Sequence, residues 1–385
     1  MNPELRKQIA LLIHTSGAWT RQVMAGVSEY AKSIGNWDFW IEPRGFYDQI
    51  TLPEDWYGDG VICRLTNDKL RQQVERRSLP TVNVSWLSEH SKTIPKVVSD
   101  EQACGKMAAE FFLQRGWSHF GFVGPPPGLD YSDRTELAFQ ELILQSGHAV
   151  FRFDHHLEFG LLTVGQQQPQ MMEWLRAVPK PIVLLVWTTN IGHEITLLAR
   201  QIGLSVPDDI AILAVEMDPL ISSLCPVPIS YIDQSPRRVG ARAAEVLDQM
   251  IKGESPPEQP LLIPPLAIAE RMSLDTLFTK DELIRRAIDY IRVNLENPLQ
   301  VSEVAEAVSI SRRSLEHRFE QTLGRSPAQV IRQNRLSQAK HLLRETGLTV
   351  AEIAYRTGHE HVETFNRFFK RETGTTPTEF RTGRT

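Results

Sequence analysis

Cysteine is scarce in this sequence, and long apolar runs are missing from it. The three cysteines, Cys63, Cys104 and Cys225, lie far apart and form no CxxC pair, so we expect neither a disulfide framework nor a structural zinc site. No apolar stretch approaches the roughly 20 residues of a membrane-spanning helix. The short run IALLI near the start is followed by polar residues, without a small-residue cleavage site. We expect it to form a buried strand of a cytoplasmic protein and not a secretory signal.

Catalytic motifs are missing as well. The GPPPG run after FGFVG lacks the Lys and Ser/Thr of a phosphate-binding loop, and no G-x-G-x-x-G follows a predicted strand. The histidines of DHH at residues 154–156 would point to opposite sides of an extended chain, and no further ligands cluster near them in the sequence. No Ser–His–Asp arrangement can be assigned. We therefore predict no metal site, no cofactor and no enzymatic activity.

What is present is an unequal distribution of charge. The 385 residues carry a formal net charge of −5. From Lys280 onward, 18 Lys and Arg outnumber 14 Asp and Glu, which gives this part +4 and leaves −9 for the remainder. A basic C-terminal part behind an acidic body predicts that a polyanion would bind at the C-terminal end.

Most of the chain alternates short apolar runs with amphipathic stretches. The runs predict strands and are IALLIH, GVIC, TVNVS, FGFVG, IVLLVW and IAILAV. The stretches between them have apolar residues at helical spacing, and most end at a Gly, a frequent helix C-cap. This alternation predicts parallel sheets in α/β layers, with a ligand beyond the carboxyl ends of the strands.

The domain boundaries follow from this pattern. A chain of 385 residues exceeds the size of a single core, so two or three domains are expected. Prolines concentrate between residues 253 and 280, and the pattern after Lys280 is entirely helical. We predict an α/β domain at 1–270, a linker at 271–280 and an all-α domain at 281–385.

The helical part contains a repeat. Residues 301–327, VSEVAEAVSISRRSLEHRFEQTLGRSP, match residues 350–377, VAEIAYRTGHEHVETFNRFFKRETGTTP, with one extra residue in the second copy. Each copy predicts a short helix, a tight turn (SIS or GHE) and a second helix. The inward residues of the second helices are Leu315 and Phe319, or Phe365 and Phe369. This order of elements is that of a helix-turn-helix unit.

A common phrase closes both copies. A Gly (Gly324, Gly374) would cap the second helix, and a Ser or Thr (Ser326, Thr376) would cap the next one, with Pro in its first turn. A generic helical solenoid is one interpretation, but solenoids usually need three or more repeats. The connector at residues 327–345 would span about 28 Å, near the ~34 Å between successive major grooves of DNA. The sequence favours two DNA-reading helices over a solenoid.

Residues from about 282 to 381 resemble the DNA-binding domain of AraC/XylS regulators, including the GxSP and GxxP closers. The resemblance implies two helix-turn-helix units that enter successive major grooves, with base contacts at Arg313, Glu316 and His317. Arg can read guanine and Glu can accept from cytosine. The candidate DNA contacts on the outward faces of the two second helices are Arg312, Arg313, Ser314, Glu316 and His317, and then His361, Val362, Glu363, Thr364, Asn366 and Arg367.

Residues 97–124 and 202–247 resemble the sugar-binding core of lactose-repressor-type regulators and periplasmic binding proteins. The resemblance implies two α/β lobes with a sugar between them, in front of the all-α domain. It places a stacking aromatic at Trp19 and a hydroxyl-chelating carboxylate at Asp100, and it puts Glu216 where the family has Asp. The family's usual Arg position holds Thr135 here, with Arg134 one residue earlier. The candidate ligand-binding residues are Trp19, Asp100, Arg134, Thr188, Thr189, Asn190 and Glu216.

A sensor of this kind ahead of an AraC-type domain resembles the arrangement of xylose operon regulators. The resemblance implies a sugar-responsive transcriptional activator with xylose or a related pentose as effector, and with operator DNA, RNA polymerase and a second copy of itself as partners. We expect sugar to close the lobes and to act on the DNA-binding part through residues 269–279. The alternatives are a sensor of another sugar or metabolite, an α/β enzyme fused to a DNA-binding domain, and a transport binding protein, which the DNA-binding part opposes.

Overall fold

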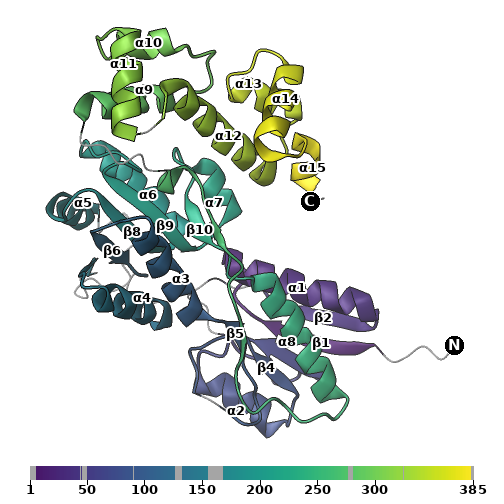
Figure 1. The fold of residues 1–385 in the computed structure, drawn as a ribbon. Helices are drawn as coiled ribbons and strands as arrows, with labels where there is room; N and C mark the ends of the chain where they lie inside the picture. The colour runs from purple at the N-terminus through teal and green to yellow at the C-terminus, as the bar shows by residue number, and fades with distance from the viewer. Residues whose placement is uncertain are drawn as a thin grey trace.

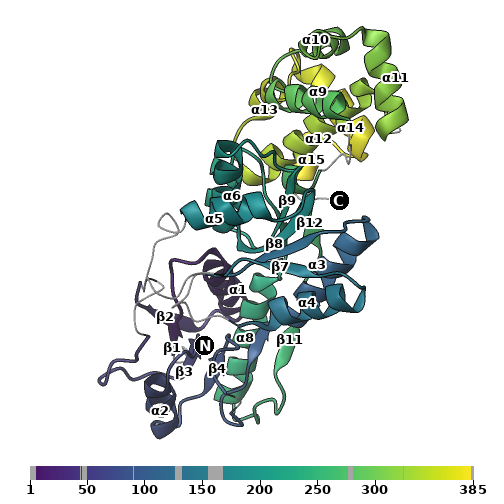
Figure 2. The same cartoon turned by 90° about the vertical axis from the view of Figure 1, so that its left-hand side faces the viewer.

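The computed structural model describes residues 6–43, 45, 50–89, 91–125, 132–154, 168–275, 281–323 and 325–382. The chain forms two α/β lobes and an all-helical domain, which confirms the predicted fold class. Both views show the helical domain stacked on the second lobe, at the end of the molecule away from the first (Figures 1 and 2). Gly324, His155, His156 and residues 276–280 of the predicted linker lie outside the described residues.

Lobe 1 is built on a four-stranded parallel sheet in the order β2-β1-β3-β4. Its strands are β1 (Lys7–Leu12), β2 (Trp37–Ile41), β3 (Gly60–Cys63) and β4 (Thr81–Asn83). A parallel pair of β5 (Val97–Ser99) and β11 (Leu261–Ile263) continues it. The helices α1 (Ala18–Ile34) and α8 (Pro236–Ile251) cover one face, and α2 (Asp68–Arg76) covers the other.

Lobe 2 is built on a six-stranded sheet in the order β12-β10-β9-β8-β6-β7, in which only the β10–β12 pair is antiparallel. Its strands are β6 (Phe120–Val123), β7 (Val150–Arg152), β8 (Ile182–Thr188), β9 (Ile210–Glu216), β10 (Ser230–Ile232) and β12 (Ile268–Ala269). The helices α3 (Glu101–Gln114) and α4 (Arg134–Gln145) cover one face, and α5 (Gln168–Ala177) and α6 (Thr189–Gln201) cover the other. The short helix α7 (Pro219–Leu224) follows β9. No helix of the described segments is long and apolar enough to span a bilayer.

The chain crosses between the lobes three times, after β5, after β10 and after β11. Hydrogen bonds tie the crossing segments to one another. The amide of Asp100 donates to the carbonyl of Ile263 at 2.8 Å, and the hydroxyl of Ser235 donates to the carbonyl of Pro264 at 3.1 Å. The three crossings therefore form one hinge, and lobe 1 takes its elements from both ends of the α/β region.

The helical domain contains the two predicted helix-turn-helix units. Its helices are α9 (Glu282–Val293), α10 (Val301–Ala307), α11 (Arg312–Leu323), α12 (Pro327–Glu345), α13 (Val350–Arg356), α14 (Val362–Thr373) and α15 (Pro377–Thr382). Leu315 and Phe319 are buried in the core of the first unit, and Phe365 and Phe369 in that of the second. The connector α12 lies between the units, as Figure 1 shows.

The phrase that closes each copy caps the helices as predicted. The hydroxyl of Ser326 accepts from the amide of Gln329, and that of Thr376 accepts from the amide of Glu379, both at 3.3 Å. Each cap is followed by the expected Pro, at Pro327 and Pro377. The repeated phrase therefore starts the next helix in both copies, and in the second copy Gly374, with a φ of +80°, ends α14.

Residues 271–274, which we expected to begin a linker, are instead packed against lobe 2. They include a short 3-10 helix, η3 (Met272–Leu274). Its buried Ser273 hydroxyl donates to the carbonyl of Ile212 in β9 at 2.6 Å, while Leu274 enters the core of lobe 2. Met272 packs on the core of the first helix-turn-helix unit. Successive side chains of this segment thus pack into two different cores, that of lobe 2 and that of the first helix-turn-helix unit. The segment therefore cannot move independently of either.

Lobe 1 depends on a close approach of two helices. A methyl group at Gly26 of α1 would lie 1.9 Å from the carbonyl oxygen of Arg237, and one at Gly240 of α8 would lie 1.9 Å from that of Val23. The two backbones are therefore in direct contact where the helices meet. Any side chain at either position would force them apart, because the clashing atoms are backbone.

We expect Gly240→Ala to lower the free energy of unfolding by about 1–3 kcal/mol, the usual cost of overpacking. Chemical denaturation measures it. Gly347→Ala is the matched control, because nothing lies within 4 Å of a methyl group there. Equal effects of the two substitutions would contradict the close contact of α1 and α8.

Candidate ligand pocket and DNA-binding surface

A cavity of about 110 Å³ lies between the lobes at the hinge. Lobe 1 lines it with the start of α1 and the segments after β3 and β4. Lobe 2 contributes the ends of β8 and β9 and the starts of α3 and α4, and the hinge contributes Gln234. The strands thus reach the cavity with their carboxyl ends, where parallel α/β folds bind ligands.

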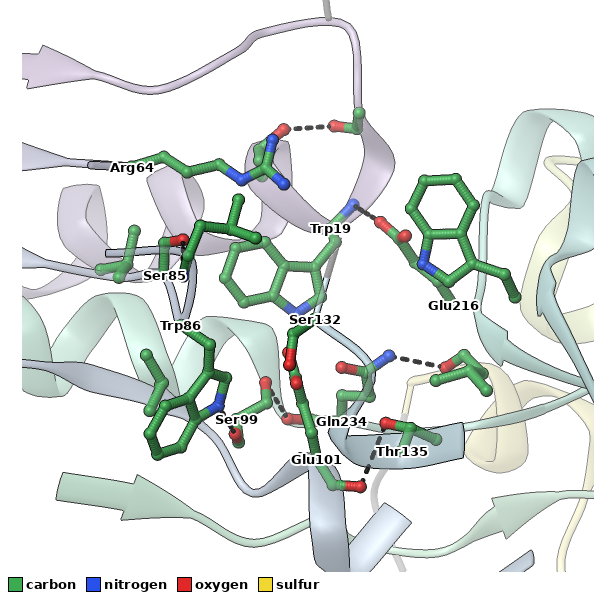
Figure 3. Close-up of a pocket in the computed structure, with 17 residues that line it drawn as sticks. Trp19, Arg64, Ser85, Trp86, Ser99, Glu101, Ser132, Thr135, Glu216 and Gln234 are labelled. Carbon is green, nitrogen blue, oxygen red and sulfur yellow. Dashed lines mark hydrogen bonds between the residues drawn. The ribbon is translucent and has the colours of Figure 1, made fainter. Parts of the chain in front are cut away.

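Three indole rings line the cavity, those of Trp19, Trp86 and Trp187. Figure 3 shows Trp19 at the centre, with Arg64 and Trp86 on one side and Glu216 on the other. Trp86 is held from two directions: its Nε1 donates to the carbonyl of Ser99 at 3.1 Å, and the guanidinium of Arg134 lies 4.0 Å from its ring centroid. The rings therefore present apolar faces beside the polar groups of the cavity, and that of Trp86 is held in place.

Two carboxyl groups face these rings. Burial raises the pKa of Glu216 to about 7, against the hydrogen bond that its Oε1 accepts from the amide of Trp19 at 3.3 Å. Burial also raises the pKa of Glu101 to about 7, and its Oε2 has no hydrogen-bond partner among the described residues. The positive charge of Arg64 opposes both shifts. Near neutral pH, each of these carboxyl groups can thus be protonated and donate a hydrogen bond, or be ionised and accept one.

The two lobes supply different chemistry to the cavity. Trp19, Arg64 and Trp86 belong to lobe 1, whereas Glu101 and Glu216 belong to lobe 2. Contacts across the cleft already join the lobes: the Trp19–Glu216 hydrogen bond, the Arg134–Trp86 stacking, and an ion pair between Arg21 and Asp218 at 3.3 Å. A ligand that contacts both sets of side chains would add to this closure.

The predicted ligand-binding residues divide between the cavity and its supports. Trp19 and Glu216 line the cavity. Asp100 does not: its carboxylate caps α3 by accepting from the amide of Ala103 at 2.9 Å, and the next residue, Glu101, lines the cavity. Arg134 lies behind Trp86, not in the lining.

The residues of the WTTN segment (187–190) also have different roles. Thr188 caps α6, and the hydroxyl of Thr189 accepts from the amide of Asp218 at 3.0 Å. Asn190 is exposed on the first turn of α6. Trp187, directly before them, lines the cavity. None of these three side chains lines the cavity, because α6 begins at Thr189 and they lie at its N-terminus. Their ligand-binding role stays a prediction.

Sequence reasoning missed Arg64, Trp86, Glu101 and Gln234. Arg64 and Trp86 follow the correctly predicted strands GVIC and TVNVS. Their place just after the carboxyl ends of parallel strands was the available signal. Glu101 and Gln234 lie at hinge crossings, which the local sequence does not mark.

The residues on the outward face of α11 are those that the helical period predicted. Arg312, Arg313, Ser314 and His317 are exposed, and Glu316 is half-buried. Two of these side chains are already engaged with each other, since the Nε of Arg312 donates to Glu316 at 2.8 Å. Ser314 interacts with the N-terminal cap, because its amide donates to the hydroxyl of Ser311 at 3.1 Å. Arg313 and His317 therefore remain the strongest candidates for base contacts in this helix.

In α14, the candidates are likewise turned outward. The exposed ones are His361, Glu363, Thr364, Asn366 and Arg367, whereas Val362 is half-buried against the core of the second unit. The DNA-contacting roles in both helices stay predictions.

The turn of the second unit fixes the two units to each other. Gly358 has a φ of +71°, and a methyl group there would lie 2.6 Å and 2.7 Å from the carbonyl oxygens of Leu295 and Asn297 in the first unit. Arg335 of α12 donates to the same Asn297 carbonyl at 2.8 Å. The relative position of the two recognition helices is therefore set by direct packing as well as by the length of α12.

Known families match successive parts of the chain: a XylR N-terminal domain over residues 8–100, a periplasmic binding protein-like domain over 109–274 and a helix-turn-helix domain over 304–383. The xylose operon regulatory protein of Escherichia coli K12 is 29% identical over 386 aligned positions, covering 98% of this chain and 97% of that protein. A solved structure described as the xylose-binding transcription activator xylR superposes with a TM-score of 0.79 at 28% identity, covering 98% of both chains. This chain is a XylR-like regulator.

The relatives of this XylR-like regulator agree along its length. The xylose operon regulatory protein of Haemophilus influenzae Rd is 26% identical over 383 positions, covering 97% of this chain and 98% of that protein. These relatives are transcription regulators and not enzymes. The predicted class, a sugar-responsive, DNA-binding transcriptional regulator, is confirmed. Among the described residues, no group of three or more His, Cys, Asp or Glu is placed to hold a metal ion.

We expect Arg313→Ala in the XylR-like regulator to weaken operator binding by about 1–3 kcal/mol and to relax the preference at one base position. Binding to a set of single-base operator variants measures both. Arg356→Ala removes the same charge from an exposed position of α13, outside the recognition helices, and should leave base preference intact. A uniform loss over all sequences would show that Arg313 contacts phosphate.

The two cavity carboxyls predict a pH dependence of stability. Their pKa values in the folded protein, about 7, lie above the ordinary glutamate value of 4.5. Their contribution is therefore fully present below pH 4.5 and is lost as the pH rises through 7. We expect the ligand-free protein to melt several degrees lower at pH 8 than at pH 5, because about 1 kcal/mol shifts Tm by a few degrees. Glu101→Gln with Glu216→Gln should flatten this difference; an unchanged pH profile in the double variant would refute the assignment.

Proposed function

We propose that the chain is a cytoplasmic activator that senses xylose or a related pentose, binds operator DNA as a homodimer and acts on RNA polymerase. The full-length relatives named xylose operon regulatory proteins support the effector. The chemistry of the cavity carries the proposal, since indole faces oppose two carboxyls and an arginine between the lobes. Its volume, about 110 Å³, lies below the range of pockets for drug-sized ligands and suits a single small polar molecule.

In this proposal, the sugar joins the two lobes. Its C–H face packs on the indoles of lobe 1, and its hydroxyls bond to Glu101 and Glu216 of lobe 2. Hydroxyls that donate to these groups favour the ionised carboxylates and so lower their pKa values. Near neutral pH, sugar binding should accordingly release protons. Glu216 is longer than the Asp of the family and would reshape the pocket. A pentose related to xylose is therefore the second candidate effector.

The signal to the DNA-binding domain passes through packed contacts of lobe 2. Arg292 of α9 forms an ion pair with Asp208, just before β9, and the two side chains are only 10% and 8% exposed. Arg292 also donates to the carbonyl of Asp275 at 2.8 Å. The other end of β9 is Glu216 in the cavity. We infer that the DNA-binding domain moves together with lobe 2 when sugar closes the cleft.

Asp208→Asn tests this function and its coupling. Operator affinity is measured with and without saturating xylose, and xylose affinity by calorimetry. We expect xylose to tighten DNA binding of the wild type within the usual 5–150-fold range of allosteric coupling. The variant should bind xylose normally but lose most of this factor, because Arg292 loses its buried partner.

Asp38→Asn is the control, since it breaks an exposed ion pair with Arg6 in lobe 1, far from the helical domain. Full coupling in Asp208→Asn would refute the route through lobe 2. A wild type that binds no pentose would refute the proposed effector.

A further inference from the structure

A second cavity adjoins the first and shares one wall with it. Its volume is about 290 Å³, against about 110 Å³ for the first. The shared wall consists of Trp19, Val215, Glu216 and Gln234. This larger space also lies between the lobes.

The partition between the cavities consists of side chains that line both of them. It includes the Glu216 side chain, whose carboxylate accepts from the amide of Trp19 at 3.3 Å. This distance lies beyond the usual 2.7–3.2 Å of an N–H···O bond. Burial also disfavours the ionised form of this carboxyl group and raises its pKa to about 7. A ligand hydroxyl that replaced the Trp19 amide as donor would let this side chain turn and would open the wall.

The second cavity has the chemistry of a carbohydrate subsite. Met217, Pro219 and Leu266 give it apolar surface, and Leu266 is 58% exposed at its edge. Gln22, Asp233 and Arg238 add an amide, a carboxylate and a guanidinium. Sites of this composition combine apolar walls with a few polar groups that fix orientation.

Both lobes and the hinge form the second cavity, as they form the first. Trp19, Gln22 and Arg238 belong to lobe 1, Met217 and Pro219 to lobe 2, and Leu266 to a hinge crossing. A ring bound there would therefore also favour closure of the cleft.

We propose that the sensor binds a ligand of two sugar rings, with one ring in each cavity and the linkage passing Glu216. This inference rests on the proposed sugar-sensing function and extends it from a single pentose to a pentose disaccharide. A single pentose fills the first cavity and leaves the second to water.

Calorimetry with xylose and with β-1,4-linked xylobiose tests the proposal on the full chain. We expect the wild type to bind xylobiose at least 10-fold more tightly than xylose. Leu266→Trp should fill the second cavity, abolish this advantage and leave xylose affinity unchanged. Leu220→Trp is the control, because Leu220 is 67% exposed on α7 and lines neither cavity.

The outcomes separate this inference from the proposed function. If xylose binds and xylobiose binds no more tightly, the second subsite is refuted while pentose sensing stands. An equal loss of both sugars in Leu266→Trp, with Leu220→Trp normal, would also refute it, because the two cavities would then not act separately. If neither sugar binds the wild type, pentose sensing and this inference both fail.

Discussion

Strand β9 is paired with β8 from Ile210 to Glu216, and it runs from the base of the helical domain to the cavity. It pairs with β8 on one side and β10 on the other, and the buried hydroxyl of Ser273 donates to the carbonyl of Ile212 in its middle. Asp208 lies just before it, beneath the helical domain, and Glu216 ends it in the cavity. A central strand bonded on both sides does not stretch or bend easily, so a displacement of one end moves the other. In the proposed function, this rigidity would carry a movement at the cavity to the base of the helical domain.

Local pattern predicted the layers of the fold but not how the chain connects them. The six short apolar runs correspond to β1, β3, β4, β6, β8 and β9, because fully buried parallel strands are continuously apolar. The three-residue strands β5 and β11 were missed. They pair with each other over more than 160 positions of sequence, and β11 lies in the proline-rich segment taken for a domain exit. Interleaved lobes depend on such distant pairing, which periodicity does not record.

The two functional surfaces differed in how well they could be predicted. The outward faces of α11 and α14 follow from one buried pair each, Leu315 with Phe319 and Phe365 with Phe369, because a helix fixes the direction of every side chain once one face is known. The cavity is assembled from loops of separate strands, so only Trp19 and Glu216 of the seven predicted residues line it. Asp100 and Glu101 are an example: of these two neighbouring acids, Asp100 caps α3 and Glu101 faces the cavity. The orientation of the first turn of α3 decides which of the two reaches the cavity, and the sequence alone does not give that orientation.

Because the chain crosses the hinge three times, lobe 1 cannot be completed until late in synthesis. Lobe 1 needs α8 and β11, which begin more than 150 residues after the ends of β3 and β4. At about 5–20 residues per second, this delay lasts about 10–30 s. During that time, the face of β1 and β3 that α8 will cover has only α1 against it, while the strands β6 to β10 of lobe 2 are made first. The nascent chain therefore exposes an unfinished apolar sheet for much of its synthesis, and lobe 1 is the part of the chain where we expect protection by a chaperone to matter most.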